Sequence, residues 1–583
     1  MLEAAPIFFG NADAPLFGWC HLALPEKALG LGLVICNPFG FEEVCAHRGL
    51  GHLAVAAAAS GVATLRFDYA GCGNSSGSEL DPDTVARWLA SIHTAIDTLK
   101  RRSGVQQVAL LGLRLGATLA AMAAASRTDV AGVVAIAPVV QGRLYLRELR
   151  ILAETTVSAG DGPMEDFIGL ESAGFLLTKE AMESISALDL HTVHQRPAAS
   201  VLIVDRDDLP SRPQWANALT ALGANVTVAK WPGYRDMMTD PQRSLIPVEL
   251  IARVVTHINT WRADQSADIV SLHMTHSFVT NTFHEMPVKI EVGGGTLFGL
   301  LTTPISAEKS AKGILLVNSG SVHNIGPNRL WVRLARSWAA RGMTVLRLDL
   351  SGIGDSPPRP GSAGNVVYSA EAGADIDAAI RYMREQLGMT DCRMLGLCSG
   401  AYHSFKAAVN GVPFTLAVLI NPLTFFWDIG KPLNDGIKDY EVVSQSSAYR
   451  KQIFSLEPWS KLLRGQLDIP YLFTFAQRRV QTLLSPFMLA MAHLLRISMK
   501  QDLARELVVA SRTSVQHFVF ASKEPGIELL KSQGKRSLDR LVLQSRVTVN
   551  FIPDADHTFT RLEARDRLVK LLDQLMFGEG VVA

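Results

Sequence analysis

The sequence is poor in the features that define several large classes of protein. Its 583 residues include only 6 cysteines, which are too few and too scattered for a disulfide framework, and no two of them form the Cys-x-x-Cys pair typical of a zinc site. The 56 Lys and Arg residues are balanced by 55 Asp and Glu residues, so the formal net charge is +1. A chain without a basic excess has no electrostatic basis for binding nucleic acid or an anionic membrane surface.

Targeting and membrane signals are also lacking. Residues 1–10 have neither the basic start nor the apolar run of a signal peptide. The most apolar stretch, 108–125, contains Arg114 and glycines, and we interpret it as a buried strand followed by a buried helix rather than a membrane span. We therefore expect a cytoplasmic protein in a reducing compartment.

Apolar residues are plentiful, at 48% against 19% charged, which indicates filled hydrophobic cores and not disorder. The chain is about twice as long as one core usually supports, so two domains are expected. Three segments recur along the chain: LFG at 16–18 returns at 297–299, LRFD at 65–68 returns as LRLD at 346–349, and GLRLG at 112–116 returns as GLCSG at 396–400. We predict a tandem duplication, with one domain at 1–265 and a second at 283–583.

The second half alternates short apolar runs with helical patterns. The expected strands are 313–318, 344–349, 391–397, 416–421, 516–521 and 547–552. Because these runs are apolar throughout, they are typical of parallel strands covered on both faces. Helical periodicity over 328–340 and 370–387 lies between them. The pattern predicts the α/β class, with a doubly wound, mainly parallel sheet in each half and a larger helical lid in the second.

A cysteine stands at the centre of the pentapeptide GLCSG at 396–400, between an expected strand and an expected helix. Glycines two residues away on each side suit a tight strand-to-helix turn that projects Cys398 from the carboxyl edge of the sheet. His557 follows the last expected strand, and Glu524 follows the strand before it. A histidine so placed can activate the nucleophile, and a carboxylate can orient the histidine. The pattern predicts a Cys-His-Glu triad.

This turn, and the chain order of nucleophile, acid and histidine, resemble the α/β-hydrolase superfamily, and the resemblance covers nearly the whole chain twice. The segment DLSGIGDS at 349–356 also looks like the loop after that family's fourth strand. GLRLGA at 112–117 is more weakly similar to motifs in hydrolases associated with exopolysaccharide and exosortase loci. The resemblance implies that Cys398 is the nucleophile, His557 the base and Glu524 the orienting acid, with no cofactor and no metal expected.

Backbone N–H groups would stabilise the oxyanion in such an enzyme. One donor is expected at Ser399, and the other at Ser321 or Val322 in the loop after the first central strand. Other interpretations stay open: the cysteine as a small buried residue, Ser399 as the nucleophile, and Glu524 as a solvated loop carboxylate. His403, on the helix after the turn, is expected at the helix surface.

The first half lacks the catalytic groups. Its turn carries Arg114, which cannot be deprotonated to attack a carbonyl, and Asp236 stands where the catalytic histidine has its counterpart. We predict a pseudo-hydrolase in which Arg114 either pairs with Asp207 or Asp208 or binds an anion. The glycine-rich run at 71–77 looks like a dinucleotide-binding loop, but its spacing does not fit that fingerprint, so nucleotide binding is not expected.

The insertion at 423–514 occupies the position of a lid and is rich in aromatic residues, including Phe425 and Trp427, which favours an acyl pocket closed to water. The first hypothesis is a hydrolase that cleaves an ester or thioester through a Cys398 acyl-enzyme. The second is an acyltransferase that passes the acyl group from a thioester to an alcohol or amine. The third is a non-catalytic protein that binds an acyl chain or a partner. The expected partner is a small-molecule acyl ester or thioester, free or carrier-bound, with no nucleic acid and no transmembrane segment.

Overall fold

The computed structural model describes residues 4–156, 167–192, 194–210, 213–262, 277–305, 310–428, 430, 501–522 and 524–578. The chain forms two compact units. The first comprises Met1–Val366 and Thr558–Lys570, and the second comprises Val367–His557 and Leu571–Ala583. These units do not coincide with the two sequence repeats, because the strands of the second repeat are divided between them. The repeat boundaries at 265 and 283 stay a prediction.

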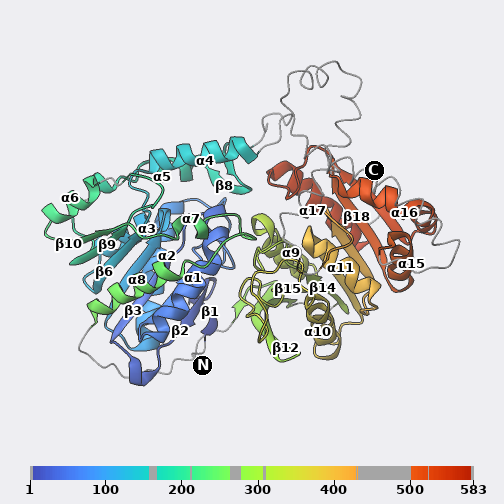
Figure 1. Cartoon of the computed structure of the whole chain (residues 1–583), viewed down its shortest axis with the longest axis horizontal. Helices are drawn as coiled ribbons and strands as arrows, with labels where there is room; N and C mark the ends of the chain where they lie inside the picture. The colour runs from blue at the N-terminus through green and yellow to red at the C-terminus, as the bar shows by residue number, and fades with distance from the viewer. Residues whose placement is uncertain are drawn as a thin grey trace, which may run out of the picture. The chain divides into compact units, whose positions relative to one another are not determined.

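The first repeat forms an eight-stranded sheet in the order β1-β2-β4-β3-β5-β6-β9-β10 (Figure 1). Its strands are β1 (Ala4–Asn11), β2 (Ala14–His21), β3 (Leu31–Cys36), β4 (Ala63–Phe67), β5 (Gln107–Leu113), β6 (Val130–Ile136), β9 (Ser200–Val204) and β10 (Asn225–Ala229). Its helices are α1 (Phe41–Ala59), α2 (Thr84–Ser103), α3 (Leu115–Ala125), α4 (Gly142–Thr156), α5 (Lys179–Ser186), α6 (Gln214–Ala221), α7 (Tyr234–Met237) and α8 (Val248–Ile258). A separate hairpin is made by β7 (Gly169–Ser172) and β8 (Phe175–Thr178). The pairs β1–β2 and β2–β4 are antiparallel, and the strands that follow are parallel.

The second repeat forms a nine-stranded sheet in the order β11-β12-β13-β15-β14-β16-β17-β18-β19. Its strands are β11 (Phe278–Val279), β12 (Phe283–Val292), β13 (Gly295–Pro304), β14 (Lys312–Leu316), β15 (Thr344–Leu348), β16 (Asp391–Leu397), β17 (Leu416–Ile420), β18 (Val515–Ala521) and β19 (Val547–Ile552). Its helices are α9 (Leu330–Ala340), α10 (Ala372–Glu385), α11 (Ser399–Val409), α15 (Leu503–Thr513), α16 (Gly526–Leu543) and α17 (Leu562–Phe577). Apart from the short β11, the strand order repeats that of the first sheet. The predicted α/β fold class, with two mainly parallel sheets in tandem, is confirmed.

Hydrophobic layers cover both faces of the first sheet. Val34 and Leu110 belong to the layer that includes α2 and α3, whereas Leu33 and Leu111 belong to the layer that includes α1 and α8. Since successive side chains of a strand point to opposite faces, a strand covered on both sides must be apolar throughout. This requirement explains why the strands could be read from the sequence as uninterrupted apolar runs.

Within the first unit, the first repeat packs against the early strands of the second. Trp19 and Phe298 belong to one buried aromatic cluster, with ring centroids 4.8 Å apart. Arg347, fully buried on β15, donates to Asn74 Oδ1 at 2.5 Å and forms an ion pair with Glu285 at 3.0 Å. A buried charge is tolerated only when it is paired. The two repeats are therefore joined here by apolar packing and by obligatory polar contacts.

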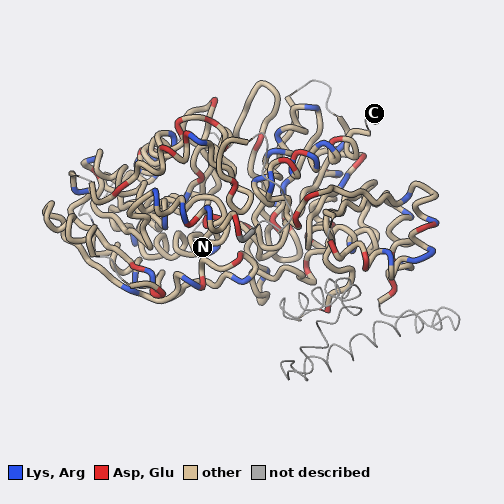
Figure 2. Tube along the Cα trace, turned by 90° about the horizontal axis from the view of Figure 1, so that it is seen from above, with Lys and Arg blue, Asp and Glu red and all other residues tan. Residues whose placement is uncertain are grey.

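Lys and Arg are interspersed with Asp and Glu along the trace (Figure 2), in keeping with the formal net charge of +1. Among the described residues, no helix is long and apolar enough to cross a membrane. The stretch 108–125 is a buried strand followed by a buried helix, β5 and α3, as predicted. Most of the predicted lid at 423–514 lies outside the described residues, which resume at 501 and include α15.

Candidate active site

Cys398 stands in the turn between β16 and α11. Its backbone has φ 58° and ψ −115°, a conformation that costs a non-glycine residue on the order of 1–3 kcal/mol and is found at nucleophile turns. Gly396 permits the turn, because a Cβ there would lie 2.2 Å from the carbonyl carbon of Gly400. Cys398 also donates its N–H to the carbonyl of Ile420 on β17 at 2.9 Å. The strained turn is thus held by the sheet, and the cysteine is half-buried rather than packed in the core.

The structure brings His557 and Glu524 together. His557 Nδ1 lies 3.0 Å from Glu524 Oε1. The side chain of Glu524 is 6% exposed and that of His557 is 27% exposed, so the interpretation of Glu524 as a solvated loop carboxylate is wrong. Glu524 follows β18 and His557 follows β19, and these strands are parallel neighbours. Their carboxyl ends therefore meet at one edge of the sheet, where functional loops of open α/β sheets gather.

The pKa of His557 depends on Cys398 as well as on Glu524. Burial by itself lowers the pKa of His557, but the negative charges of Cys398 and Glu524 raise that pKa well above its usual value. The other ring nitrogen, Nε2, is buried and has no hydrogen-bond partner within the described part of the chain. In the predicted triad, Nε2 is the nitrogen that would face the Cys398 thiol. A thiolate beside an imidazolium is the state in which cysteine is a strong nucleophile.

Asn421 holds the loop that carries His557. Its buried side chain donates to the carbonyl of His557 at 2.8 Å and accepts from the N–H of Ala521, the last residue of β18, also at 2.8 Å. In the repeat alignment Asn421 corresponds to Ala137, and the two residues have φ values of 44° and 45°. The backbone is therefore the same in both repeats, and the amide is peculiar to the second. Comparison of the repeats is a sequence signal that could have singled out this residue, because the first repeat has alanine at this position.

Tyr368 was missed by the sequence analysis. Its ring is 7% exposed and stacks on Trp427 with centroids 4.2 Å apart at 18°. Burial first, and then the charges of Cys398 and Tyr402, raise the pKa of Tyr368 well above its usual value. The phenol therefore stays protonated beside the thiol. Tyr368 lies in the irregular loop before α10, where neither periodicity nor a motif marks it.

The predicted oxyanion donors lie in different units. Ser399 is the first residue of α11 and is 1% exposed, so its N–H stands at a helix start directly after Cys398. Ser321 and Val322 follow β14 in the first unit. Val322 donates its N–H to the carbonyl of Ser319 at 3.1 Å, which makes Ser321 the better of these two candidates. The second donor stays a prediction.

Three residues near the turn have structural environments. Cys392 is 1% exposed, and burial raises the pKa of its thiol to about 11. His403 was predicted at the helix surface, and that prediction is wrong: it is 5% exposed and its Nε2 lies 2.8 Å from the carbonyl of Val367. Phe425, expected in the lid, packs in the core against Phe405 with ring centroids 5.5 Å apart. The loop before α10 and the start of the lid insertion both cover α11, which its own periodicity did not reveal.

The first repeat keeps the shape of the turn without the nucleophile. Arg114 has φ 54° and ψ −121°, within a few degrees of Cys398. Gly112 again permits close approach, since a Cβ there would lie 2.3 Å from the Cα of Ala117. Strain of this kind is retained here although an arginine has no nucleophilic use for it. The turn was thus inherited with the fold.

Arg114 has different partners from those expected. Its guanidinium donates to Glu42 Oε1 at 2.8 Å and also to Glu148. The predicted pairing with Asp207 or Asp208 is wrong, and the latter instead pairs with a neighbouring arginine at 2.7 Å. Glu42 and Glu148 come from α1 and α4, helices that the spacing of the turn could not identify. Two carboxylates neutralise Arg114, so a structural ion pair explains it better than an anion site.

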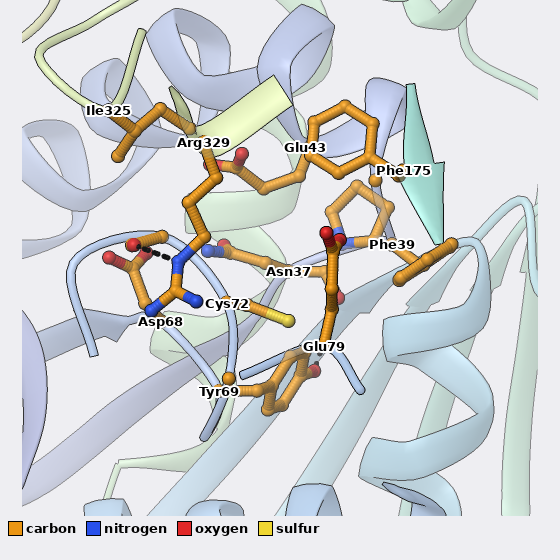
Figure 3. A pocket seen from close by; sticks show the side chains of 14 residues that line it. Asn37, Phe39, Glu43, Asp68, Tyr69, Cys72, Glu79, Phe175, Ile325 and Arg329 are labelled. Carbon is orange, nitrogen blue, oxygen red and sulfur yellow. Dashed lines mark hydrogen bonds between the residues drawn. The ribbon is translucent and has the colours of Figure 1, made fainter. Parts of the chain in front are cut away.

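The glycine-rich run at 71–77 binds an arginine of the second repeat. Arg329 donates to three backbone carbonyls of this run, at 2.8, 2.9 and 2.6 Å. In Figure 3 its guanidinium reaches the loop beside Asp68. The cavity next to it has a volume of about 30 Å³, room for a water molecule and not for a nucleotide. A phosphate-binding loop presents N–H groups, whereas this one presents carbonyls to a cation.

Among the described residues, one group has the composition of a metal site: Glu43, His47 and His323, whose ligand atoms lie within 4.8 Å of one another. His47 is already held by two carboxylates, with Nδ1 3.3 Å from Glu43 and Nε2 3.1 Å from Asp355. Burial lowers the pKa of His47, but these carboxylates raise it to about 10. The rings of His47 and His323 are stacked at 3.8 Å and 11°, so their nitrogens do not converge as metal ligands do. An imidazolium between two carboxylates accounts for the group.

Residues 40–159 match the family model described as "Serine aminopeptidase, S33". This segment runs from α1 through the turn at Arg114 into α4, and the second repeat has the same strand order with a cysteine in the turn. This part of the chain is therefore similar to an α/β-hydrolase family, and the shared strand order gives both repeats the same fold.

Several solved structures are similar to parts of this chain. An α/β serine hydrolase from Xanthomonas campestris is 14% identical, with 45% of this chain and 97% of that chain covered and a TM-score of 0.29. Est1E from Butyrivibrio proteoclasticus, with bound ferulic acid, is 20% identical, with 44% and 98% covered and a TM-score of 0.33. A dienelactone hydrolase from Anabaena variabilis is 10% identical, with 51% and 98% covered and a TM-score of 0.30. None of the curated proteins compared with the chain matches it.

Proposed function

We propose that this α/β hydrolase cleaves an ester or a thioester through an acyl-enzyme on Cys398. The arrangement around His557 carries the proposal. Its Nδ1 lies 3.0 Å from the buried carboxylate of Glu524, and the charge of Cys398 raises its pKa against the effect of burial. A cysteine in a strained strand-to-helix turn, with a histidine and an orienting acid in reach, is the arrangement that activates a nucleophile.

The reaction proceeds in two steps. The Cys398 thiolate attacks the acyl carbon, and the carbonyl oxygen becomes an oxyanion that the N–H of Ser399 stabilises. Collapse of this intermediate breaks the bond to the leaving alcohol or thiol, which takes its proton from the His557 imidazolium, and the acyl group stays on sulfur as a thioester. Neutral His557 then removes a proton from water as the water oxygen attacks the thioester. The carboxylic acid leaves, and the thiolate–imidazolium pair is restored.

A thiolate nucleophile favours substrates whose leaving group is good. Attack on a thioester exchanges one thioester for another at nearly equal energy, whereas attack on an oxygen ester forms a less stable acyl compound. Serine is the better nucleophile for unactivated esters, since its acyl-enzyme is an oxygen ester. We therefore place acyl thioesters and activated esters ahead of simple alkyl esters as substrates.

The first repeat is proposed to be a pseudo-hydrolase. Arg114 occupies the nucleophile position and is neutralised by Glu42 and Glu148, so it supplies no group that could attack an acyl carbon. All turnover is then expected from the second repeat. The first repeat contributes the contacts of Trp19 and Asn74 inside the first unit.

The test measures release of p-nitrophenol from p-nitrophenyl acetate, and of thiol from acetyl-pantetheine, by the full chain. Cys398→Ala should abolish both activities, and Cys392→Ala, which alters a buried cysteine of the preceding strand, should retain them. Intact mass should increase by one acetyl group in the wild-type protein and not in Cys398→Ala. Full turnover by Cys398→Ala would overturn the mechanism.

The same assay separates hydrolysis from acyl transfer. Products are identified with and without an added alcohol or amine. Free acetate as the product in both cases supports the hydrolase. An acetylated acceptor that forms at the expense of acetate would keep the acyl-enzyme and make the protein an acyltransferase.

A further inference from the structure

We propose that a pocket in the first unit binds a small organic anion with an apolar body. The pocket has a volume of about 750 Å³, which is within the range of about 300–1,000 Å³ typical of small-molecule sites. Its walls come from α1, β2 and β4 of the first repeat, and from β12, β13 and the loop after β15 of the second. All of its lining residues belong to the first unit, whereas Cys398, Glu524 and His557 belong to the second. The pocket is therefore a different site from the triad, and it does not depend on the proposed reaction.

The charged lining is mostly cationic. It consists of four cations and one aspartate, namely Arg48, Arg66, Lys289, His47 and Asp355. Two further histidines are neutral, because burial lowers the pKa of His21 to about 3 and also lowers the pKa of His52. The aspartate is fully occupied, because it accepts from Arg66, from His47 at 3.1 Å and from the Trp19 indole at 3.1 Å. It therefore leaves no negative charge for Arg48.

Arg48 is the cation that lacks a counter-charge. Its guanidinium donates to the carbonyl of Ser244 at 3.3 Å, and it forms no ion pair with a carboxylate in the described part of the chain. Burial lowers the pKa of Arg48, the direction expected for a cation with no carboxylate beside it. A partly buried cation without a partner is costly. A ligand anion in the pocket would supply the missing partner, and an arginine fork suits a carboxylate or a phosphate group.

One face of α1 is built to keep the pocket open. Arg48, Gly51, His52 and Val55 all line it, and their spacing places them on the same side of a helix. A Cβ at Gly51 would meet only Arg66 Cζ, at 3.9 Å, an ordinary contact. A glycine inside a helix costs about 0.5–1 kcal/mol relative to alanine. Since no packing contact requires Gly51, the pocket is a physical reason for its presence.

Gly49 on the same helix shows the contrast. A Cβ at Gly49 would lie 2.6 Å from Met237 Sδ, so a larger residue here would displace the buried Met237 side chain of α7. Gly49 does not line the pocket. Gly49 therefore allows packing against α7, whereas Gly51 leaves space in the pocket.

Much of the rest of the wall is apolar. It includes aromatic, aliphatic and proline side chains, namely Trp19, Leu297, Phe298, Pro357 and Pro358. Trp19, Leu297 and Phe298 are 8%, 0% and 3% exposed, so their exposed apolar surface is mainly that of the two prolines. An inorganic ion would leave this proline surface uncovered, whereas an anion with an alkyl or aryl body would bury it. The ligand class is therefore an amphipathic carboxylate or phosphate monoester.

The experiment titrates the full chain with three probes that share a ten-carbon tail, by isothermal calorimetry. The probes are decanoate, decyl phosphate and decyltrimethylammonium. We expect one molecule of decanoate or decyl phosphate to bind per chain, and the tighter of the two identifies the head group. The cationic probe should bind at least about tenfold more weakly, since it meets Arg48 with the wrong sign. Equal binding of the cation and the anions would overturn the proposal, as would the absence of saturable binding by both anions.

Variants locate the bound probe. Arg48→Gln should weaken anion binding at least about tenfold by removing a charge-assisted contact, and Gly51→Leu should abolish it by filling the space. Arg253→Gln serves as the control, because Arg253 is an exposed arginine on α8 that pairs with Glu249 and does not line the pocket. Its affinity should be that of the wild-type chain.

A further variant adds a negative charge beside the pocket without changing a buried side chain. Val55 is 49% exposed, so Val55→Glu should fold normally and repel the anion from the same helix face. Circular dichroism and the melting temperature verify the fold of each variant. Wild-type affinity in folded Arg48→Gln and Val55→Glu would refute the site.

Discussion

Replacing Asn421 with alanine tests whether His557, the proposed catalytic base, is held in place from the sheet. The change leaves the backbone unaffected, because Ala137 adopts φ 45° at the equivalent position of the first repeat, against 44° for Asn421. What is lost is the hydrogen bond to the carbonyl of His557 and the one from the N–H of Ala521, both 2.8 Å long.

The expected loss of stability follows from the burial of the two partners. Ala521 is 2% exposed, so water cannot reach its N–H, and an unsatisfied buried donor costs about 1–3 kcal/mol. The side chain of His557 is 27% exposed, and its carbonyl can be rehydrated, so the net loss there is about 0.5–1.5 kcal/mol. Asn421→Ala should therefore lower the free energy of unfolding by about 2–4 kcal/mol.

The expected effect on turnover is larger than a purely structural role would give. Glu524 still binds Nδ1 of His557, so the ring stays in the site while its backbone moves. A displacement of about 1 Å can cost on the order of 10²-fold in rate. We expect kcat to fall by about 10- to 100-fold while KM changes by less than about twofold, because substrate binding does not use this amide.

The assay combines steady-state kinetics on p-nitrophenyl acetate with urea unfolding of the same preparations. Ala137→Asn is the matched control: it places the same side chain at the same backbone position in the repeat without a triad, and turnover should not change. If Asn421→Ala kept kcat within about twofold of wild type and unfolded at the same urea concentration, the positioning role would be refuted.

The other predictions concern the thiols, the acid and the first repeat. Iodoacetamide should label Cys398 first, as peptide mapping after brief exposure would detect, and faster labelling at any other cysteine would count against an activated nucleophile. Burial raises the pKa of the other five thiols: to about 11 at Cys20 and Cys392, to about 12 at Cys45 and Cys72, and further at Cys36. Glu524→Gln removes one of the charges that raise the pKa of His557. Because the imidazolium form of His557 stabilises the thiolate, the alkaline limb of the kcat/KM profile should move to lower pH. An unchanged alkaline limb would exclude Glu524 from the triad. The fragment 283–583 should aggregate in size-exclusion chromatography, because removal of 1–265 uncovers the aromatic cluster between the repeats, and a monodisperse fragment with full activity would contradict this.

The strands and helices of the fold could be predicted from the sequence, and so could the chain order of Cys398, Glu524 and His557. The predicted strands 391–397 and 547–552 have the bounds of β16 and β19, and GLCSG at 396–400 forms the strained turn of Cys398. These features are local. An apolar run predicts a strand buried on both faces, and a glycine two residues from the turn permits close approach of the strand and the following helix. Both signals lie within a few residues of the feature that they predict.

The contacts between residues far apart in the chain depend on how the helices and strands pack. Arg114 pairs with Glu42, 72 residues away, and not with the acids that follow the equivalent strand. Asn421 reaches the carbonyl of His557 across 136 residues, and the burial of His403 depends on the loop before α10. Such contacts are selected by the free energy of burying polar groups with satisfied partners once the helices and strands have packed. Hydrophobic periodicity predicts that one face of a helix or strand is buried, whereas the tertiary fold determines which residues bury it.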